Sequence, residues 1–293
     1  MANNVSNLVG EAWASMLQEV LREKFVGMAI ANTKFEGDFT GNDTVHFPRV
    51  PDITSLDLAT SYSDVTVQDV TSTDETFTLD TRKHWAFELS EEDIVEMRIS
   101  PTNQLITGGA HAFANDYDDA IMAEYVNAAY TIDDGNMTTA TNGGAGNAII
   151  LTSANMLDFL SAINETLDEN NVPEADRFVV VSPEEWRLVS TMPELTHATT
   201  AGDGVVRNGF MGTLLDIKLY KSNNTVTATS VRHLIAGSGN PVSFAANIKP
   251  QVQITPPSMR ESFTYLYKSQ TKFGVKTFVE GANRMIDCEI VNA

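Results

Sequence analysis

Basic residues are scarce in this sequence. Its 293 residues include 19 Lys and Arg against 39 Asp and Glu, which gives a formal net charge of −20 at pH 7. A protein that grips nucleic acid over its whole surface needs positive charge to neutralise phosphates. The charge balance therefore argues against nucleic-acid binding as the main role of the chain.

The sequence also lacks a second cysteine and any long apolar run. Cys288 stands alone, so no intramolecular disulfide can form, which fits synthesis in a reducing compartment. No stretch approaches the roughly 18 apolar residues of a membrane-spanning helix, and the first residues lack the basic start and cleavage site of a secretory signal. Alternation in residues 286–290 puts Cys288 on one face with Ile286 and Ile290, which predicts a buried strand cysteine.

The overall composition is that of a folded protein. Hydrophobic residues make up 42% and charged residues 20% of the chain, which argues against disorder. The length allows one large domain or two modest ones, each with a real core.

The charge is unevenly distributed along the chain. Residues 1–216 contain 10 basic and 35 acidic side chains, whereas residues 217–279 contain eight basic side chains and one acidic one, Glu261. Opposite potentials can meet across an interface between copies, so this division suits head-to-tail association. Solvated faces on a monomer would explain the same charges, and both interpretations stay open here.

A long segment of β character, residues 45–89, has little apolar surface of its own. Between residues 50 and 81 it contains seven acidic residues and no basic one. If it forms a hairpin, each limb of about 18 residues would reach about 60 Å at about 3.3 Å per residue. A hairpin this long and thinly apolar is marginal alone. We therefore expect an acidic arm that lies on another surface, most naturally that of a neighbouring subunit. Apolar residues alternate in it at Val65 and Val67, at Phe77 and Leu79, and at Trp85, Phe87 and Leu89.

The rest of the chain mixes expected helices and strands. Phe113, Tyr117, Ile121 and Tyr125 recur every four residues, which predicts one face of a long helix over about 104–130. Ser182, Pro183 and Glu185 form a complete helix start. The other expected helices are 7–31, a short one from Ser90, 152–169 and 183–191. The expected strands are 178–181, 214–220, 231–236, 242–254, and a long hairpin of 262–279 with 284–291. Residues 32–44 are expected to be an extended connector and 131–147 a loop.

Within residues 178–224, a strand and the capped helix are followed by a glycine turn and a second strand. The pattern G-x-x-G-x-h-x-x-h-x-h-Y-x-S, where h is apolar, is formed there by Gly209, Gly212, Leu214, Ile217, Leu219, Tyr220 and Ser222. This order and this pattern resemble the axial domain of tailed-phage major capsid proteins, in which the pattern commonly follows the capped helix. The order of parts along the whole chain also matches the family.

The resemblance implies an α+β architecture, the Hong Kong 97-type capsid fold. It assigns residues 1–44 to an N-terminal arm and 45–89 to the extended loop, a β-hairpin arm. Residues 90–147 and 255–293 become a peripheral domain with a spine helix at about 104–130. Residues 148–254 become the axial domain.

The resemblance also implies a structural function. Such a protein is no enzyme and needs no cofactor, metal or membrane; it assembles into hexamers and pentamers of an icosahedral shell around double-stranded DNA, which it encloses without sequence-specific binding. The implied location is the virion, after assembly in the host cytoplasm, and the implied partners are a portal and, in some members, a decoration protein. Because a helix is expected almost from Met1, we expect a separate scaffolding protein. Residues 50–81 contain no Lys and Lys83 lies at the arm's base, so the covalent cross-link of some members is not carried over.

Two charged sets are the candidate contacts between subunits. The acidic arm would dock on a basic surface of a neighbour, and the basic set could instead face packaged DNA in part or be a solubilising strand face. The acidic residues are Asp57, Asp64, Asp69, Asp74 and Glu75. The basic residues are Lys249, Arg260, Lys268, Lys272 and Lys276.

Other functions are weighed against this one. The shell of an encapsulin-like nanocompartment, which loads a cargo enzyme, would share the fold. A metal enzyme would have to use carboxylates of the long helix, Asp116, Asp118, Asp119 and Glu124, but a solvated helix face explains them better because Asp119 and Glu124 are five apart.

Two further patterns have simple explanations. His46 and His84 could face each other across the arm strands, where packing or hydrogen bonding is the default and a metal the alternative. Residues 143–146 are glycine-rich without the Lys of a phosphate loop, which predicts a flexible loop.

Overall fold

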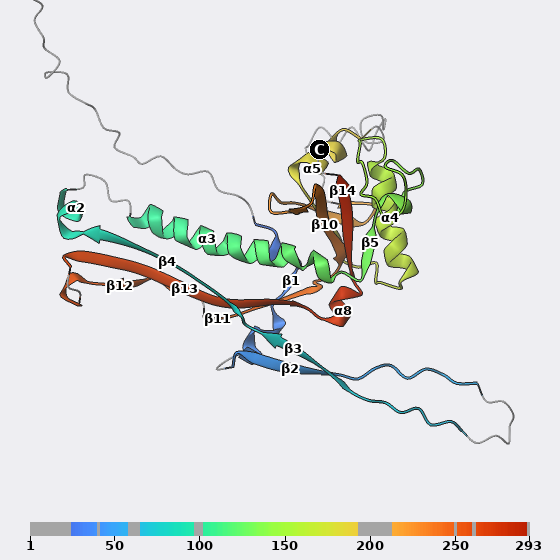
Figure 1. Cartoon of the computed structure of the whole chain (residues 1–293), viewed down its shortest axis with the longest axis horizontal. Coiled ribbons are helices and arrows are strands. Elements are labelled where there is room, and N and C mark those ends of the chain that lie inside the picture. The colour runs from blue at the N-terminus through green and yellow to red at the C-terminus, as the bar shows by residue number, and fades with distance from the viewer. Residues whose placement is uncertain are drawn as a thin grey trace, which may run out of the picture.

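The chain folds into a lobe, a long sheet covered by a long helix, and a projecting hairpin (Figure 1). The computed structural model describes residues 25–39, 42–57, 65–96, 102–192, 213–248, 251–259 and 262–291. Helices and strands are mixed throughout, as the sequence predicts for an α+β protein. No helix in these ranges is long and apolar enough to cross a membrane.

The strand β13 (Thr264–Thr277) organises the long sheet. The strand β4 (Thr81–Ser90) lies along one edge of it in an antiparallel ladder that runs from Thr264 opposite Ser90 to Phe273 opposite Thr81. The other edge is shared by β11 and β12, and β1 joins the far side of β11 in parallel. The bounds of these strands are β1 Ala31–Asn32, β11 Val242–Ile248 and β12 Gln253–Thr255.

The long helix α3 (Thr102–Met122) lies along this sheet and continues as the 3-10 helix η3 (Ala123–Asn127) (Figure 1). A glycine allows this close contact, because a Cβ at Gly109 would clash with the ring of Trp85 on β4. Trp85 stacks on Phe87 with ring centroids 5.7 Å apart, and Phe87 stacks on Tyr267 of β13 at 5.0 Å. The aromatic face of β4 is thus half-buried beside the helix, and the expected spine helix is confirmed.

The lobe is built on a seven-stranded sheet. Its strands run in the order β5-β14-β10-β6-β8-β7, and β9 pairs with β10 as well. Helices α4 (Met156–Glu169) and α5 (Pro183–Ser190) contribute to one core, while α1 (Gly27–Ile30) and the end of α3 pack on the other face. The strand bounds are β5 Tyr130–Ile132, β6 Arg177–Val181, β7 Thr213–Leu214, β8 Ile217–Lys221, β9 Val226–Ala228, β10 Val231–Ser238 and β14 Met285–Val291.

Several local predictions are confirmed in this lobe. β6 is buried at all five positions, as expected of a central strand covered on both faces. Ser182 caps α5 and exchanges hydrogen bonds with Glu185 in a capping box. Cys288 is buried, and burial raises the pKa of its thiol well above the usual value. Its strand neighbours Ile286 and Ile290 share its core, so the predicted face is correct.

The shorter elements connect these layers. The projecting hairpin is formed by β2 and β3, which pair with each other alone among the described strands. Ser90 caps the short helix after β4 as predicted, since its Oγ accepts a hydrogen bond from the amide of Asp93 at 2.9 Å. The bounds are η2 Lys34–Phe39, β2 Thr44–Arg49, β3 Thr73–Thr78, α2 Glu91–Glu96, η4 Asp134–Asn136, η5 Pro257–Met259 and α8 Val279–Ala282.

Two predicted hairpins pair differently in the structure. The prediction of one arm hairpin over residues 45–89 is wrong at its end, because β3 stops at Thr78 and β4 pairs with β13. Residues 262–279 and 284–291 do not pair either: β13 belongs to the long sheet and β14 to the lobe, with α8 between them. The cause is burial, since β14 is buried on both faces over its first four residues and fits only inside the lobe.

Other segments are more divided than predicted. The expected strand 214–220 turns sharply at Leu215 and Asp216, whose φ angles are 52° and 62°, so β7 and β8 form a tight hairpin. The expected strand 242–254 is two strands, β11 and β12. The connector 32–44 contains the 3-10 helix η2. Of the helix expected over 7–31, residues 7–24 lie outside the described ranges and α1 ends at Ile30.

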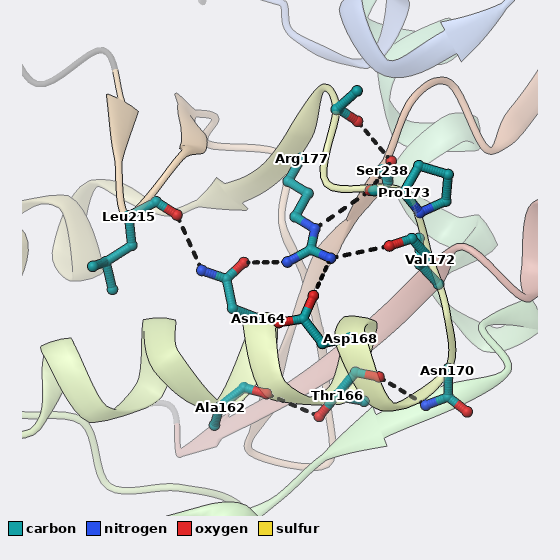
Figure 2. A network of polar contacts seen from close by, with 11 residues as sticks. Ala162, Asn164, Thr166, Asp168, Asn170, Val172, Pro173, Arg177, Leu215 and Ser238 are labelled. Atoms are coloured by element: carbon teal, nitrogen blue, oxygen red, sulfur yellow. Dashed lines mark hydrogen bonds and ion pairs between the residues drawn. The ribbon is translucent and has the colours of Figure 1, made fainter.

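A buried arginine fixes the end of α4 to β6, as Figure 2 shows. The side chain of Arg177 is 4% exposed. It donates hydrogen bonds to Asp168 at 2.5 Å, to Asn164 at 3.0 Å and to the carbonyl of Val172 at 3.0 Å. One guanidinium therefore satisfies acceptors on the helix and on the loop that follows it, which is a geometry that its planar fork of donors suits.

Replacing Arg177 tests how much this network stabilises the lobe. Arg177→Met keeps the apolar stem but leaves the acceptors around it unpaired, so we expect the free energy of unfolding to fall by about 2–4 kcal/mol. The control is Lys218→Met, because Lys218 pairs with Asp176 at 2.5 Å while 46% exposed, and such exposed pairs contribute less than about 1 kcal/mol. Urea unfolding of both variants measures the difference, and equal losses would contradict the assigned role of Arg177.

Candidate assembly surfaces

The base of the projecting hairpin is held by aromatic rings from its own chain. Phe77 of β3 packs edge-to-face on Phe39 at 4.9 Å between centroids and on Phe278 at 5.9 Å. Phe47 of β2 contacts Phe278 at 5.1 Å and Phe35 at 4.8 Å. We call these five rings the arm-base cluster. It fixes the base of the hairpin, because ring pairs of this geometry add stability beyond that of the apolar area they bury.

Polar contacts reinforce the same root. Arg49 on β2 donates to Glu280 of α8 at 2.7 Å, and the carboxylate of Glu75 accepts a hydrogen bond from the amide of Val279 at 3.1 Å. Asp74 lies 2.5 Å from the ring nitrogen of His46 across the hairpin. Asp74 and Glu75, two of the predicted contacts to a neighbour, are therefore engaged within the chain.

Beyond this root the arm exposes apolar side chains. We call residues 50–57 and 65–72 the distal arm. Val65 is 78% and Val67 89% exposed, and Gln68 joins the two limbs by a hydrogen bond from the amide of Thr54 at 3.2 Å. Large apolar groups in one extended segment indicate a surface that another protein covers. The others exposed there are Val50, Ile53, Leu56 and Val70.

The predicted acidic residues of the distal arm are available for contact. Asp57 and Asp69 are exposed. Asp64 lies outside the described residues. Around the exposed valines the distal arm thus combines apolar and negatively charged groups, a composition that can add electrostatic selectivity to apolar burial.

The predicted basic set is divided by the structure. Lys268 and Lys276 are exposed on β13. Lys272 is buried and pairs with Asp43, and the hydrogen bond from Lys272 holds the pKa of the Asp43 carboxyl below its usual value. Lys249 and Arg260 lie outside the described residues. Because side chains alternate along a strand, Lys268 and Lys276 lie on the face of the sheet opposite to Tyr267 and α3.

The four carboxylates of the long helix do not form a metal site. Asp116 pairs with Lys83 at 3.2 Å, and Asp119 accepts from Asn115 at 3.0 Å. Glu124 accepts from the hydroxyl of Thr277 at 2.6 Å. Each group contacts a different partner: Asp116 and Glu124 join the helix to the sheet, and Asp119 bonds within the helix.

Asp118 is the fourth of these carboxylates, and the sequence did not predict its role as a buried hydrogen-bond acceptor. The prediction of a solvated face is wrong here, because Asp118 is 1% exposed. It accepts hydrogen bonds from the amide of Val26 at 2.9 Å, from the amide of Gly27, and from the side chain of Asn224 at 2.9 Å. A Cβ at Gly27 would lie 2.8 Å from Asp118, so glycine is required for this approach.

Asp118 therefore joins three distant parts of the chain. α1 begins at the amides that it binds, and the turn after β8 supplies Asn224 and Ser222, whose hydroxyl lies 3.4 Å away. The residues Ser222 and Asn224 follow the axial strand in the sequence, and this polar turn was the one signal that could have indicated a buried partner. The contact explains how the start of the described chain stays on the spine helix.

The glycine-rich loop at 143–146 is ordered by an internal carboxylate. Asp134 is fully buried and accepts from the amides of Thr141 and Asn142 at 2.6 Å and of Gly144 at 2.8 Å. These hydrogen bonds lower the pKa of Asp134 far below its usual value and outweigh the opposing effect of burial. The amides that a phosphate would need are thus partly occupied, and the prediction of a flexible loop is wrong.

The histidines of the arm do not meet. His46 lies against Asp74, whereas His84 lies opposite Gln270 in the long sheet. Among the described residues, the side chains close enough to hold one metal ion together are His233, Asp287 and Glu289. Sequence spacing gave no indication of this group, because its members are on two strands.

Comparisons with family models and with solved structures agree with each other. The sequence model of a family described as "Phage capsid protein" matches residues 33–289. No curated protein matches the chain. Among solved structures, one from Mycobacterium phage Che8 is similar with a TM-score of 0.80 and 22% identity, covering 98% of each chain. The capsid structure of the cyanophage P-SCSP1u gives a TM-score of 0.76 with 14% identity over 100% of this chain and 96% of that one. The capsid of Myoviridae phage XM1 gives 0.64 and 12% over 99% of each.

Replacing Asp118 tests its role at the junction. Asp118→Ala leaves two buried amides and an Asn224 side chain without their acceptor, so we expect a loss of about 2–4 kcal/mol in unfolding free energy. Residues 25–39 should also become more accessible to proteases. The control is Asp119→Ala, the exposed neighbour on the same helix, which should change stability by less than about 0.5 kcal/mol. Chemical unfolding with limited proteolysis measures both effects, and a stable, protease-resistant Asp118→Ala variant would contradict the junction.

Proposed function

This chain belongs to the phage capsid protein family and is a structural major capsid protein with the Hong Kong 97-type fold, and we propose that its distal arm joins copies into the hexamers and pentamers of an icosahedral shell. The location of such a protein is the virion. Membership of a structural family excludes the metal-enzyme alternative, and the encapsulin-like alternative is not favoured by the family match.

The observation that carries the proposal is the contrast between the two ends of the arm. Its root is packed by the arm-base cluster, while beyond Arg49 and Thr73 the apolar side chains of the distal arm are exposed. Burying one Val, Leu or Ile side chain contributes about 1.5–3 kcal/mol. Six such side chains would contribute on the order of 10 kcal/mol before the entropy of association is subtracted. A neighbouring copy of the chain would supply the surface that covers them.

Charge supports the same docking. The distal arm carries Asp57 and Asp69 exposed, and Lys268 and Lys276 are exposed on β13. We propose that these lysines receive the distal arm of an adjacent copy, together with Lys249 and Arg260 of the predicted basic set and with Asp64 on the arm. Lys272 is withdrawn from this role because Asp43 neutralises it within the chain.

We propose domain boundaries that keep the strands of each sheet in one domain. The predicted boundaries cut across strand pairing, since β11 pairs with the peripheral strand β13, while β5 and β14 pair inside the lobe. We propose an extended loop that ends at Thr78, a peripheral domain of the spine helix with the long sheet, and an axial domain that is the lobe. The N-terminal arm of residues 1–44 is retained from the sequence.

The other proposed partners are those of a shell that packages a DNA genome. We propose that the shell encloses double-stranded DNA without sequence-specific contacts, which fits a net charge of −20. A separate scaffolding protein, a portal and a decoration protein are the proposed protein partners, and the host cytoplasm is the proposed place of assembly. DNA in purified particles, rather than a cargo enzyme, would distinguish this function from that of a nanocompartment.

Polar substitution in the distal arm tests the proposed interface. Val65→Ser with Val67→Ser removes apolar groups that are exposed in the subunit, so folding should be unchanged. Losing about 1.5–3 kcal/mol per arm contact should raise the protein concentration needed for assembly by about 10- to 100-fold. Light scattering against concentration and electron microscopy measure assembly. The control pair Val65→Ile and Val67→Ile keeps the apolar surface and should assemble normally; equal assembly by the serine and isoleucine pairs would sink the proposed contact.

Charge reversal tests the electrostatic part independently. Asp57→Lys with Asp69→Lys should reduce shell yield, and the loss should be smaller at high salt, where surface charges are screened. Adding Lys268→Glu and Lys276→Glu to the same chain should restore yield in part, since each copy would carry both reversed surfaces. Native agarose gels quantify the shells. Failure of the second pair to restore any assembly would show that the arm docks on a different surface.

A further inference from the structure

Three ligand-type side chains converge on one face of the seven-stranded sheet. In the antiparallel pairing of β10 with β14, His233 lies directly opposite Glu289, and Ile235 lies opposite Asp287. Directly paired residues share a face and alternate residues return to it, so His233, Asp287 and Glu289 all lie on the side away from Cys288. One ligand atom from each lies within 4.8 Å of the other two.

The group is held in place and mostly withdrawn from water. The side chains of His233 and Asp287 are 11% and 10% exposed, and the ring nitrogen Nδ1 of His233 lies 2.8 Å from one carboxylate oxygen of Asp287 and 3.1 Å from the other. Tyr125 of η3 stacks on the imidazole with ring centroids 4.1 Å apart. The ring therefore has a fixed orientation toward the Asp287 carboxylate.

The charges of the group are not balanced by the protein around it. A single histidine faces two carboxylates, and within the described ranges no side chain bonds to that of Glu289. The neighbouring cation Arg232 is directed to Glu184 and Glu185, at 3.0 and 2.5 Å. A positive charge placed among the three groups would relieve this repulsion.

We propose that His233, Asp287 and Glu289 bind one divalent transition-metal ion, Zn²⁺ in preference to Ca²⁺ or Mg²⁺. An imidazole nitrogen with carboxylate oxygens is a ligand set that Zn²⁺ accepts, whereas Ca²⁺ and Mg²⁺ favour all-oxygen sites. Three protein ligands leave a position for water or for a group from an adjacent copy. For Nδ1 of His233 to bind the ion, the proton between it and Asp287 must leave Nδ1: it moves to Nε2 when the ring is neutral and is released to solvent when the ring is charged.

The position of the site in the lobe indicates that the ion has a structural role. β10 and β14 are central strands of the lobe, and Tyr125 is on η3, where the spine helix ends. An ion held by both strands beneath Tyr125 links the two strands across the sheet and restrains the junction with the spine. Binding to the folded state alone raises the apparent stability of the subunit.

Metal titration of the full chain tests this site. Unassembled protein stripped with a chelator is titrated with Zn²⁺ alone, and bound metal is measured by mass spectrometry after dialysis, with Ca²⁺ and Mg²⁺ in parallel. We expect one saturable equivalent of Zn²⁺, no equivalent binding of Ca²⁺ or Mg²⁺, and a raised thermal midpoint. Bound Co²⁺ should give the absorption of a four-coordinate site.

Variants locate the bound ion. Glu289→Gln keeps the shape of a half-buried side chain and should lose at least about tenfold in Zn²⁺ affinity, as should His233→Gln where circular dichroism shows that it folds. The control His84→Ala, on the exposed face of β4, should bind as the parent does. No saturable equivalent on the parent chain, or unchanged affinity in Glu289→Gln, would overturn the site.

Discussion

The ladder between β4 and β13 is the constraint on which the rest of this subunit depends. It joins residues 81–90 to residues 264–273, which are far apart in sequence, and it forms the floor on which the spine helix lies. Because β4 is committed to this ladder, the hairpin must separate from it at Thr78 and project from the sheet. The aromatic side chains of β4 are half-buried beside α3, and the thinly apolar limbs remain outside. The exposed distal arm, which we propose is covered by another copy, is thus a consequence of how its own chain pairs.

Carboxylates connect the parts that the apolar cores leave separate. Asp118 holds the start of α1 to the spine and to the turn after β8, Glu124 bonds the spine to the end of β13, and Asp134 organises the loop beside the lobe. Buried acceptors of this kind are stabilising only when donors reach them, and here backbone amides supply most of the donors. The large excess of acidic residues is therefore partly structural. Others, such as Asp57 and Asp69, are exposed on the arm, where we propose that they act between copies.

The sequence predicted features whose causes are local. The apolar run of β6, the capping box of Ser182 and Glu185, the stripe of α3 and the face of Cys288 all follow from periodicity or capping chemistry. The order of parts also indicated the family. Pairing partners could not be predicted, because alternation in β4 or β14 defines a buried face and leaves the neighbouring strand unspecified. Leu215 at a φ of 52° shows the same limit, since nothing in its residue type predicts a turn.

The burial of single charged residues could not be predicted from the sequence either. Asp118 is buried by amides 91 and 92 positions away, and Lys272 is buried beside Asp43, so sequence spacing could not distinguish either residue from its solvated neighbours.

The central claim is that a neighbouring copy covers the distal arm, and hydrogen exchange on the free subunit and on the assembled shell measures it most directly. Amides of residues 50–57 and 65–72 should exchange quickly in the free subunit and much more slowly in the shell, while those of β2 and β3 at the root change little. Equal exchange of the distal arm in both states would show that no neighbouring copy covers it.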